Sequence, residues 1–90
     1  MSERITAAAI WAVGSDEPTW LPPPKRHHDV IRVLAARGFG PGEMAPSRQG
    51  FMTTTGRFVD RVEARLIAEA AGQLLRAKLP GNKLFSEDVW

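Results

Sequence analysis

The sequence predicts a single α+β domain: a small antiparallel sheet of three or four strands, two α-helices packed on it, and assembly into an oligomer. Three observations lead to this prediction. Residues 5–13 are an apolar run that contains Ile, Val, Thr and Trp, as strands do. Residues 25–38 and 60–78 repeat apolar side chains at helical spacing. Between them, residues 49–59 hold two short strand-like runs around a Thr-Thr-Gly turn.

The length and composition set the domain count and favour self-association. A chain of 90 residues forms one domain, and such a domain buries only roughly 60–65% of the surface that its unfolded chain exposes. The chain has no cysteine, so neither a disulfide nor a thiolate zinc site adds stability. Burying more apolar surface between copies is the remaining route, and we therefore expect an oligomer.

The apolar run in residues 5–13 is expected to be a central strand. It hardly alternates between apolar and polar side chains, as strands buried on both faces do, although three consecutive alanines leave a helix possible. The run is too short to cross a bilayer and lacks the basic flank of a signal peptide, which predicts a cytoplasmic protein. Residues 19–21 are expected to return as a short antiparallel strand, and the prolines at 22–24 end the pairing.

The first helix is expected over residues 25–38. Gly38 is a typical stop signal at a helix C-terminus. Residues 39–48, rich in Gly and Pro, form a long connection that we interpret as a candidate lid or binding loop. With residues about 100° apart, one face of the first helix gathers His27, Val30, Ile31 and Leu34.

The second helix is expected to begin at Asp60, which Glu63 follows at the spacing of a capping box. It is preceded by strands at residues 49–53 and 57–59, and it is expected to run to about residue 76 or 78. Its apolar arc spans more than half of the helical wheel, whereas one packing partner needs a stripe of only about 100°. We therefore expect two partners: the sheet on one side, and a second subunit or the other helix on the other.

Two further packing expectations concern this second half. Val62 is expected to face the core. Leu84, Phe85 and Trp90 are expected to dock the C-terminal segment onto this or a neighbouring subunit, because aromatic residues seldom stand in a frayed terminus.

The basic residues are distributed unevenly. Net charge is only +2, but residues 25–65 carry eight basic side chains against four acidic ones. Nine of the twelve basic residues are Arg, whose planar fork binds phosphate and stacks on rings. A solvated basic surface accounts for the same charges, and the modest net charge argues against a general binder of nucleic acid.

The sequence offers no catalytic set and no metal site. Adjacent His27 and His28 point about 100° apart on a helix, whereas metal ligands on one helix favour spacings of three or four. No nucleophile stands with a base, Asp60 is engaged as a helix cap, and no phosphate-binding glycine motif is present. We therefore expect a protein that is not an enzyme and uses no cofactor.

The remaining signal is a combination of side chains that suits an anionic, planar ligand. Phe51 offers a ring for stacking, the arginines offer forks for phosphate, and Gln49 or Asp60 offers an edge for a base or ribose. Phenylalanines at strand positions such as Phe51 and Phe58 belong more often to the core. The candidate ligand-binding residues are His28, Arg32, Gln49, Phe51, Arg57, Asp60, Arg61, Arg65 and Arg76.

An ordered set of motifs resembles a pattern found in small bacteriophage proteins. It covers about two thirds of the chain and leaves out the first twenty-four residues. Within such proteins the chain is most similar to the anti-Thoeris sponges. The motifs are Arg26-His27-His28-Asp29-Val30-Ile31, Gln49-Gly50-Phe51, Gly56-Arg57-Phe58-Val59-Asp60-Arg61 with Glu63-Ala64, Ala71-Gly72-Gln73, and Leu84-Phe85-Ser86-Glu87-Asp88-Val89-Trp90.

The resemblance implies an oligomeric α+β protein that sequesters cyclic ADP-ribose-type immune signals, and in some members cyclic oligonucleotides, without cleaving them. It places Phe51 and Asp60 against the base and ribose, and arginines of the second helix on the pyrophosphate. We therefore expect an anti-defence protein of the host bacterial cytoplasm that binds a cyclic nucleotide and contacts no membrane.

Two alternatives remain open. One is a protein inhibitor that binds a host defence or nucleic-acid enzyme through its surface. The other is a small nucleic-acid-binding protein that uses Lys25, Arg26, Arg32 and the arginines of the second helix, and its affinity would fall steeply with salt.

Overall fold

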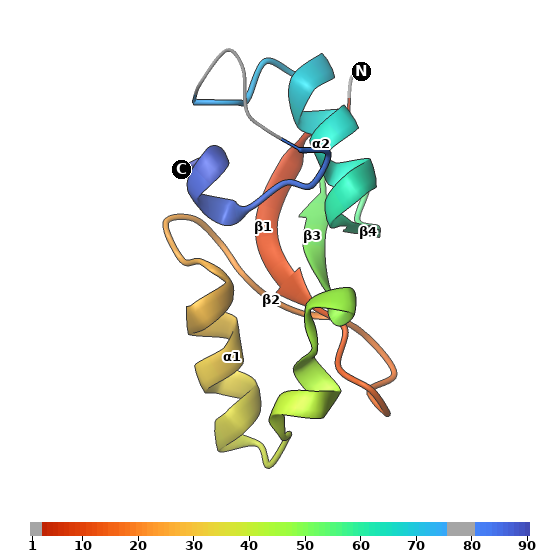
Figure 1. Ribbon diagram of the computed structural model, residues 1–90, viewed down its shortest axis with the longest axis vertical. Coiled ribbons are helices and arrows are strands. Elements are labelled where there is room, and N and C mark those ends of the chain that lie inside the picture. The colour runs from red at the N-terminus through yellow and green to blue at the C-terminus, as the bar shows by residue number, and fades with distance from the viewer. Residues whose placement is uncertain (1–2, 76–80) are drawn as a thin grey trace.

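The computed structural model describes residues 3–75 and 81–90 (Figure 1). It confirms the predicted α+β fold: a four-stranded antiparallel sheet, in the order β2-β1-β3-β4, carries two α-helices. The elements are β1 (Ile5–Ile10), β2 (Thr19–Leu21), α1 (His27–Ala36), the 3₁₀ helices η1 (Pro41–Met44) and η2 (Pro46–Arg48), β3 (Gln49–Thr53), β4 (Phe58–Asp60), α2 (Arg61–Ala70) and the 3₁₀ helix η3 (Ser86–Asp88).

Strand β1 is central, as predicted. It pairs with β2 on one side, where Ala9 lies opposite Trp20, and with β3 on the other, where Ala8 lies opposite Phe51. Its small side chains are buried on both faces of the sheet, which explains the missing alternation. The strand ends at Ile10 and not at residue 13. The backbone N–H of Trp11, the next residue, donates to Arg48 O at 2.9 Å.

Both helices pack on the same face of the sheet. Ala8 belongs to the core cluster beneath α2, and Ile10 belongs to the cluster beneath α1; these two residues of β1 point to the same side because side chains alternate along a strand. Phe51 and Leu84 complete the first cluster. The C-terminal segment crosses the sheet between the two helices (Figure 1). The prediction that this segment docks is confirmed, since Leu84 has no exposed surface.

Helix α1 lies within the predicted range and ends as expected. His27, Val30 and Leu34 are buried. Gly38 adopts a φ of 97°, in the left-handed region that favours glycine, and its N–H donates to Ala35 O at 3.0 Å. The N–H of Phe39 donates to Leu34 O at 3.1 Å, which completes a Schellman motif. The connection after it is more ordered than a simple loop, because η1 and η2 occupy most of it and bury Met44 beneath α1.

Helix α2 begins as predicted and ends early. Asp60 is its N-cap and accepts a hydrogen bond from the N–H of Glu63 at 2.8 Å. The prediction of a helix to residue 76 or 78 is wrong, because Gly72 adopts a φ of 68° and the N–H of Gln73 returns to Ala68 O at 2.9 Å. The apolar residues after this turn keep the spacing of a helix in the sequence, although α2 has already ended at Ala70. No helix in residues 3–75 and 81–90 is long and apolar enough to span a membrane.

The predicted core position of Val62 is also wrong. The core face of α2 consists of Ala64 and Ala68, which let the helix approach the sheet closely. Residues two apart on a helix point about 200° from each other, so Val62 lies on the opposite side and is 40% exposed. Leu66, one turn further on, is 64% exposed. Within the described chain, the second apolar side of α2 is therefore uncovered.

Candidate functional site

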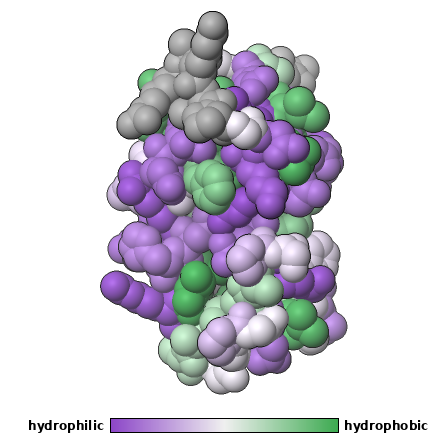
Figure 2. All heavy atoms as spheres, viewed as in Figure 1, coloured by the Kyte–Doolittle hydropathy of each residue, from purple (hydrophilic) through white to green (hydrophobic). Residues whose placement is uncertain are grey.

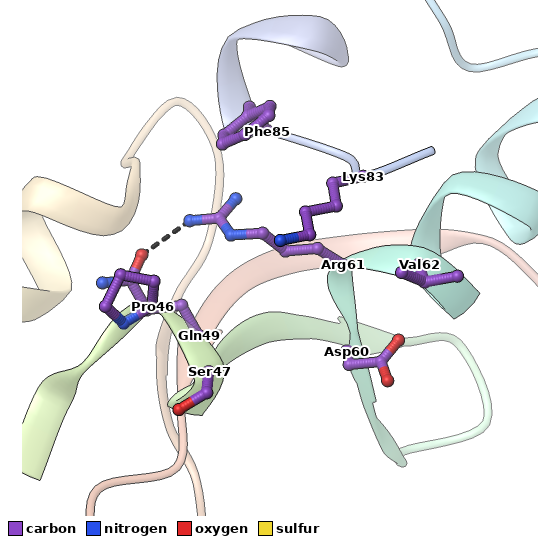
Figure 3. A pocket seen from close by; sticks show the side chains of 8 residues that line it. All are labelled: Pro46, Ser47, Gln49, Asp60, Arg61, Val62, Lys83 and Phe85. Atoms are coloured by element: carbon purple, nitrogen blue, oxygen red, sulfur yellow. Dashed lines mark hydrogen bonds between the residues drawn. The ribbon is translucent and has the colours of Figure 1, made fainter. Parts of the chain in front are cut away.

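A surface hollow of about 410 Å³ lies where the N-terminal end of α2 meets η2 and the C-terminal segment (Figure 3). This volume is within the range of roughly 300–1,000 Å³ that is usual for small-molecule sites. Its lining comes from four parts of the chain: Pro46 and Ser47 of η2, Gln49 of β3, Asp60, Arg61 and Val62 around the start of α2, and Lys83 and Phe85.

Arg61 is the centre of this hollow. Its guanidinium donates from Nη1 to Leu84 O at 2.8 Å and from Nη2 to Gln49 Oε1 at 2.6 Å (Figure 3). The Cζ atom lies 4.6 Å from the centre of the Phe85 ring. The amide nitrogen of Gln49 donates to Met44 O at 3.1 Å, which fixes the direction of its acceptor oxygen. Arg61 is therefore held in one position by groups from two distant segments, β3 and the C-terminal segment.

Two cations, Arg61 and Lys83, line this hollow against one carboxylate, that of Asp60, which caps α2. The two hydrogen-bond acceptors of Arg61 are neutral, and no carboxylate of the described residues forms an ion pair with it. Desolvation lowers the pKa of Arg61, partly offset by the charges of Glu87 and Asp88, but a guanidinium stays protonated in proteins. Lys83 extends beside Arg61 (Figure 3). A half-buried cation with neutral partners, next to an exposed ammonium, favours an anionic ligand.

A second hollow of about 410 Å³ adjoins the first. Arg61 and Phe85 line both, so this pair forms the partition between them. The far side is lined by the start of α1 and by η3, with Arg26 and His28 as its basic side chains and Glu87 as its acidic one. Together the two hollows, which we call the Arg61 site, offer a central cation with space on each side of it.

His27 closes the base of the second hollow as a neutral side chain. Its Nε2–H donates to Gly50 O at 2.7 Å, and its ring meets Phe51 edge to face at 4.9 Å between centres. Burial lowers the pKa of His27 to about 4, and the charge of Arg61 acts in the same direction. Near neutral pH, His27 therefore supports the site without adding a charge to it.

Acidification is expected to destabilise the protein through His27. Below pH 6.5 the histidine of the unfolded chain binds a proton, whereas His27 of the folded protein does not bind one until about pH 4. The free energy of unfolding is therefore highest above pH 6.5 and decreases as the pH falls from 6.5 to about 4. The expected loss is on the order of 3 kcal/mol. Urea denaturation across pH 4–7 measures it, and the slope should flatten in His27→Gln. His28→Gln, at an exposed position, serves as the control and should keep the wild-type slope.

Three of the predicted ligand-binding residues meet in the first hollow: Gln49, Asp60 and Arg61. The carboxylate of Asp60 points away from Arg61 (Figure 3) and is occupied as the cap of α2. His28 lines the second hollow, where it is exposed and lies 3.4 Å from the carboxylate of Asp29. Arg32 is exposed on α1 and lines neither hollow.

Arg57 is directed away from the site by acidic partners. Its Nε and Nη2 donate to the two carboxylate oxygens of Glu3 at 2.7 and 2.8 Å, and its Nη1 donates to Glu63 at 2.6 Å. These bonds, with those from Thr53 and Thr55, lower the pKa of Glu3 to about 2. Arg57 thus ties the N-terminal end of β1 to the β3–β4 turn.

The other predicted residues lie elsewhere. Phe51 is wholly buried in the core, with its ring edge to face against His27 and Trp90, so no face is exposed for stacking. Arg65 is 8% exposed and donates to Glu69. Arg76 lies outside the described residues.

The sequence did not single out Lys83, Phe85, Pro46 or Ser47 as binding residues. Phe85 was expected only to dock the C-terminal segment; it is 44% exposed and stacks on Arg61. Its position within the last motif was the available signal. Lys83 carries no local signal, because only the return of the C-terminal segment across the sheet brings it to α2.

The part of the chain that the structure describes contains no group of three His, Asp or Glu side chains that could hold a metal ion.

No curated protein and no solved structure matches the chain. A family model does: that of the phage T4 y16D protein, over residues 4–90. Since this match spans nearly the whole sequence, the chain belongs to the phage T4 y16D protein family.

Proposed function

We propose that this phage protein sequesters an anionic nucleotide signal, of the cyclic ADP-ribose or cyclic oligonucleotide type, in the Arg61 site, and thereby counteracts bacterial defence. The observation that carries the proposal is the state of Arg61: a half-buried guanidinium with only neutral hydrogen-bond partners, stacked on Phe85 and next to Lys83. The resemblance to the anti-Thoeris sponges and the phage origin of the family support the same function.

The phosphate groups of the ligand would bind Arg61 and Lys83. Arg61 uses two of its five N–H donors in the hydrogen bonds to Leu84 and Gln49, so further donors are left for phosphate oxygens. Charge-assisted bonds of this kind are roughly twice as strong as neutral ones. Gln49 has both ends of its amide occupied, and we therefore assign it to positioning Arg61 and not to reading a base.

The two hollows suit a ligand with an anionic centre and two bulky ends. Arg61 lies between them, so a pyrophosphate or a cyclic phosphate bridge at Arg61 would place one nucleoside in each hollow. Phe85 lines both hollows and supplies a planar apolar surface. Binding in this way would hold the signal without any chemical step.

A second copy of the chain would enclose the ligand. Val62 lines the first hollow. Together with Leu66, one turn further along α2, it forms the uncovered apolar side of this helix. Burying these side chains against another subunit would stabilise an oligomer and narrow the opening of the hollow. Native mass spectrometry measures the number of copies together with any retained ligand.

Calorimetric titration tests the proposed function. Cyclic ADP-ribose isomers and cyclic di- and trinucleotides are titrated into the protein at micromolar concentration, and saturable heat is expected from at least one of them, with the ligand recovered intact afterwards. Absence of heat with every ligand would refute the proposal. Binding to DNA or RNA with an affinity that falls steeply as salt rises would instead support the nucleic-acid alternative.

A further inference from the structure

The face of the sheet opposite the helices carries an aromatic surface. Side chains alternate along a strand, so Met52 of β3 points away from the helices that cover Phe51. Phe58 of β4 lies opposite Met52, and Trp20 of β2 lies opposite Ala9. Trp11, directly after β1, meets Phe58 edge to face. Strands β2, β3 and β4, and the residue that follows β1, therefore each contribute one large apolar side chain to the same surface.

This aromatic surface is held firmly. The indole N–H of Trp11 donates to Ser15 O at 3.0 Å, and its ring centre lies 5.6 Å from that of Phe58 at 87°. Phe58 in turn lies directly over Gly50, where a Cβ atom would come within 2.7 Å of the phenyl Cζ. The rings of Trp11 and Phe58 are therefore fixed in place, and binding sites are usually preformed in this way.

Two hollows open on this surface, on either side of Trp20. One, of about 430 Å³, lies between Trp20, Trp11 and Phe58; the other, of about 270 Å³, lies towards Arg37. Trp20 and Glu17 line both hollows. Trp20 is 51% exposed. Because tryptophan has a large apolar surface, burying this ring against a partner would contribute strongly to binding.

Glu17 is the acidic side chain that lines both hollows, and it shares the smaller one with the cation Arg37. Arg57 lines the larger hollow, but Glu3 and Glu63 neutralise it. Arg37 in the smaller hollow donates to Thr19 Oγ1 at 3.4 Å. No ion pair of Glu17 is formed within the described residues. An exposed indole therefore stands next to an available carboxylate.

We propose that this surface is a second binding site, which takes an arginine side chain from a basic segment of a partner protein. A guanidinium stacks flat on an indole and donates to a carboxylate at its edge, so Trp20 and Glu17 together match it better than they match an ammonium. The Arg61 site lies on the opposite, helical face, which is mainly hydrophilic across its middle and more apolar towards its lower end (Figure 2). The two sites are therefore able to bind their ligands at the same time.

The test uses the full chain and a short peptide of alternating glycine and arginine. Binding is followed through the indole N–H signals in nuclear magnetic resonance spectra. The signals of Trp11 and Trp20 are expected to shift, while that of Trp90, which packs on the helical face against Phe51, should stay unchanged. A matched peptide with citrulline, the neutral isostere of arginine, should bind about tenfold more weakly because the charge is lost.

Variants assign the effect to the site. Glu17→Gln is expected to weaken arginine-peptide binding about tenfold, and Trp20→Ala to abolish it. Glu87→Gln removes the same charge from the helical face and should leave the affinity unchanged. The proposal is overturned by equal affinity for the two peptides, by equal effects of the two glutamate variants, or by absence of shifts at millimolar peptide. Sedimentation provides a further check on this surface. If the wild-type protein sediments as an oligomer and the Trp20→Ala variant as a monomer, a second copy of the chain covers the surface and the proposal is overturned.

Discussion

Replacing Phe51 with alanine is expected to lower the free energy of unfolding by about 3–5 kcal/mol. Phe51 has no exposed surface, and its ring joins β3 to α2, to His27 and to Trp90. Its removal leaves a cavity where three parts of the chain meet. Small domains have a total stability of only about 5–15 kcal/mol, so a large share of it is lost. Urea denaturation measures the effect, and Phe85→Ala, at an exposed ring, is expected to cost much less.

The same position separates a core role from a ligand-stacking role. Phe51→Leu retains most of the buried volume and should leave a folded protein. If Phe51 only supports the site, this variant binds the nucleotide with wild-type affinity. A folded Phe51→Leu protein that no longer binds would place the ring in contact with the ligand, as the resemblance to the sponges implies.

Arg61→Ala is expected to weaken nucleotide binding by about 1.5–3 kcal/mol, which is about 10- to 150-fold. The loss combines the phosphate contact with the positioning of Phe85. The variant also removes the donors to Leu84 O and Gln49 Oε1, so some stability is lost as well. Calorimetric titration below the melting temperature of the variant measures the binding change.

Lys83→Ala separates binding from stability at the same site. Lys83 is exposed, and its replacement should weaken binding by about 1 kcal/mol while leaving the unfolding curve unchanged. Lys25→Ala is the matched control, because Lys25 is an exposed lysine that lines neither hollow. Unchanged affinity in both Arg61→Ala and Lys83→Ala would move the ligand to another surface.

Features that depend on neighbouring residues were predictable from the sequence. The cap at Asp60, the glycine stop at Gly38 and the turn before β4 each follow from the chemistry of a few consecutive residues. The central place of β1 followed from its apolar run, because only a strand covered on both faces lacks alternation. The end of α2 was missed although Gly72 carried the same signal, since the apolar spacing continues past it.

The sequence by itself determined that the protein is an α+β domain with arginines gathered around one strand–turn–helix unit, residues 49–65. Only the tertiary structure decided which arginine is available. Arg65 pairs with Glu69 one turn along the same helix, which is a local contact. Glu3, fifty-four residues away in sequence, occupies Arg57, whereas Arg61 meets the carbonyl of Leu84, the ring of Phe85 and the amide of Gln49. The physical reason is that helix caps and turns are set by local hydrogen bonds. The charge state of a site depends instead on which distant side chains the fold brings within a few ångströms.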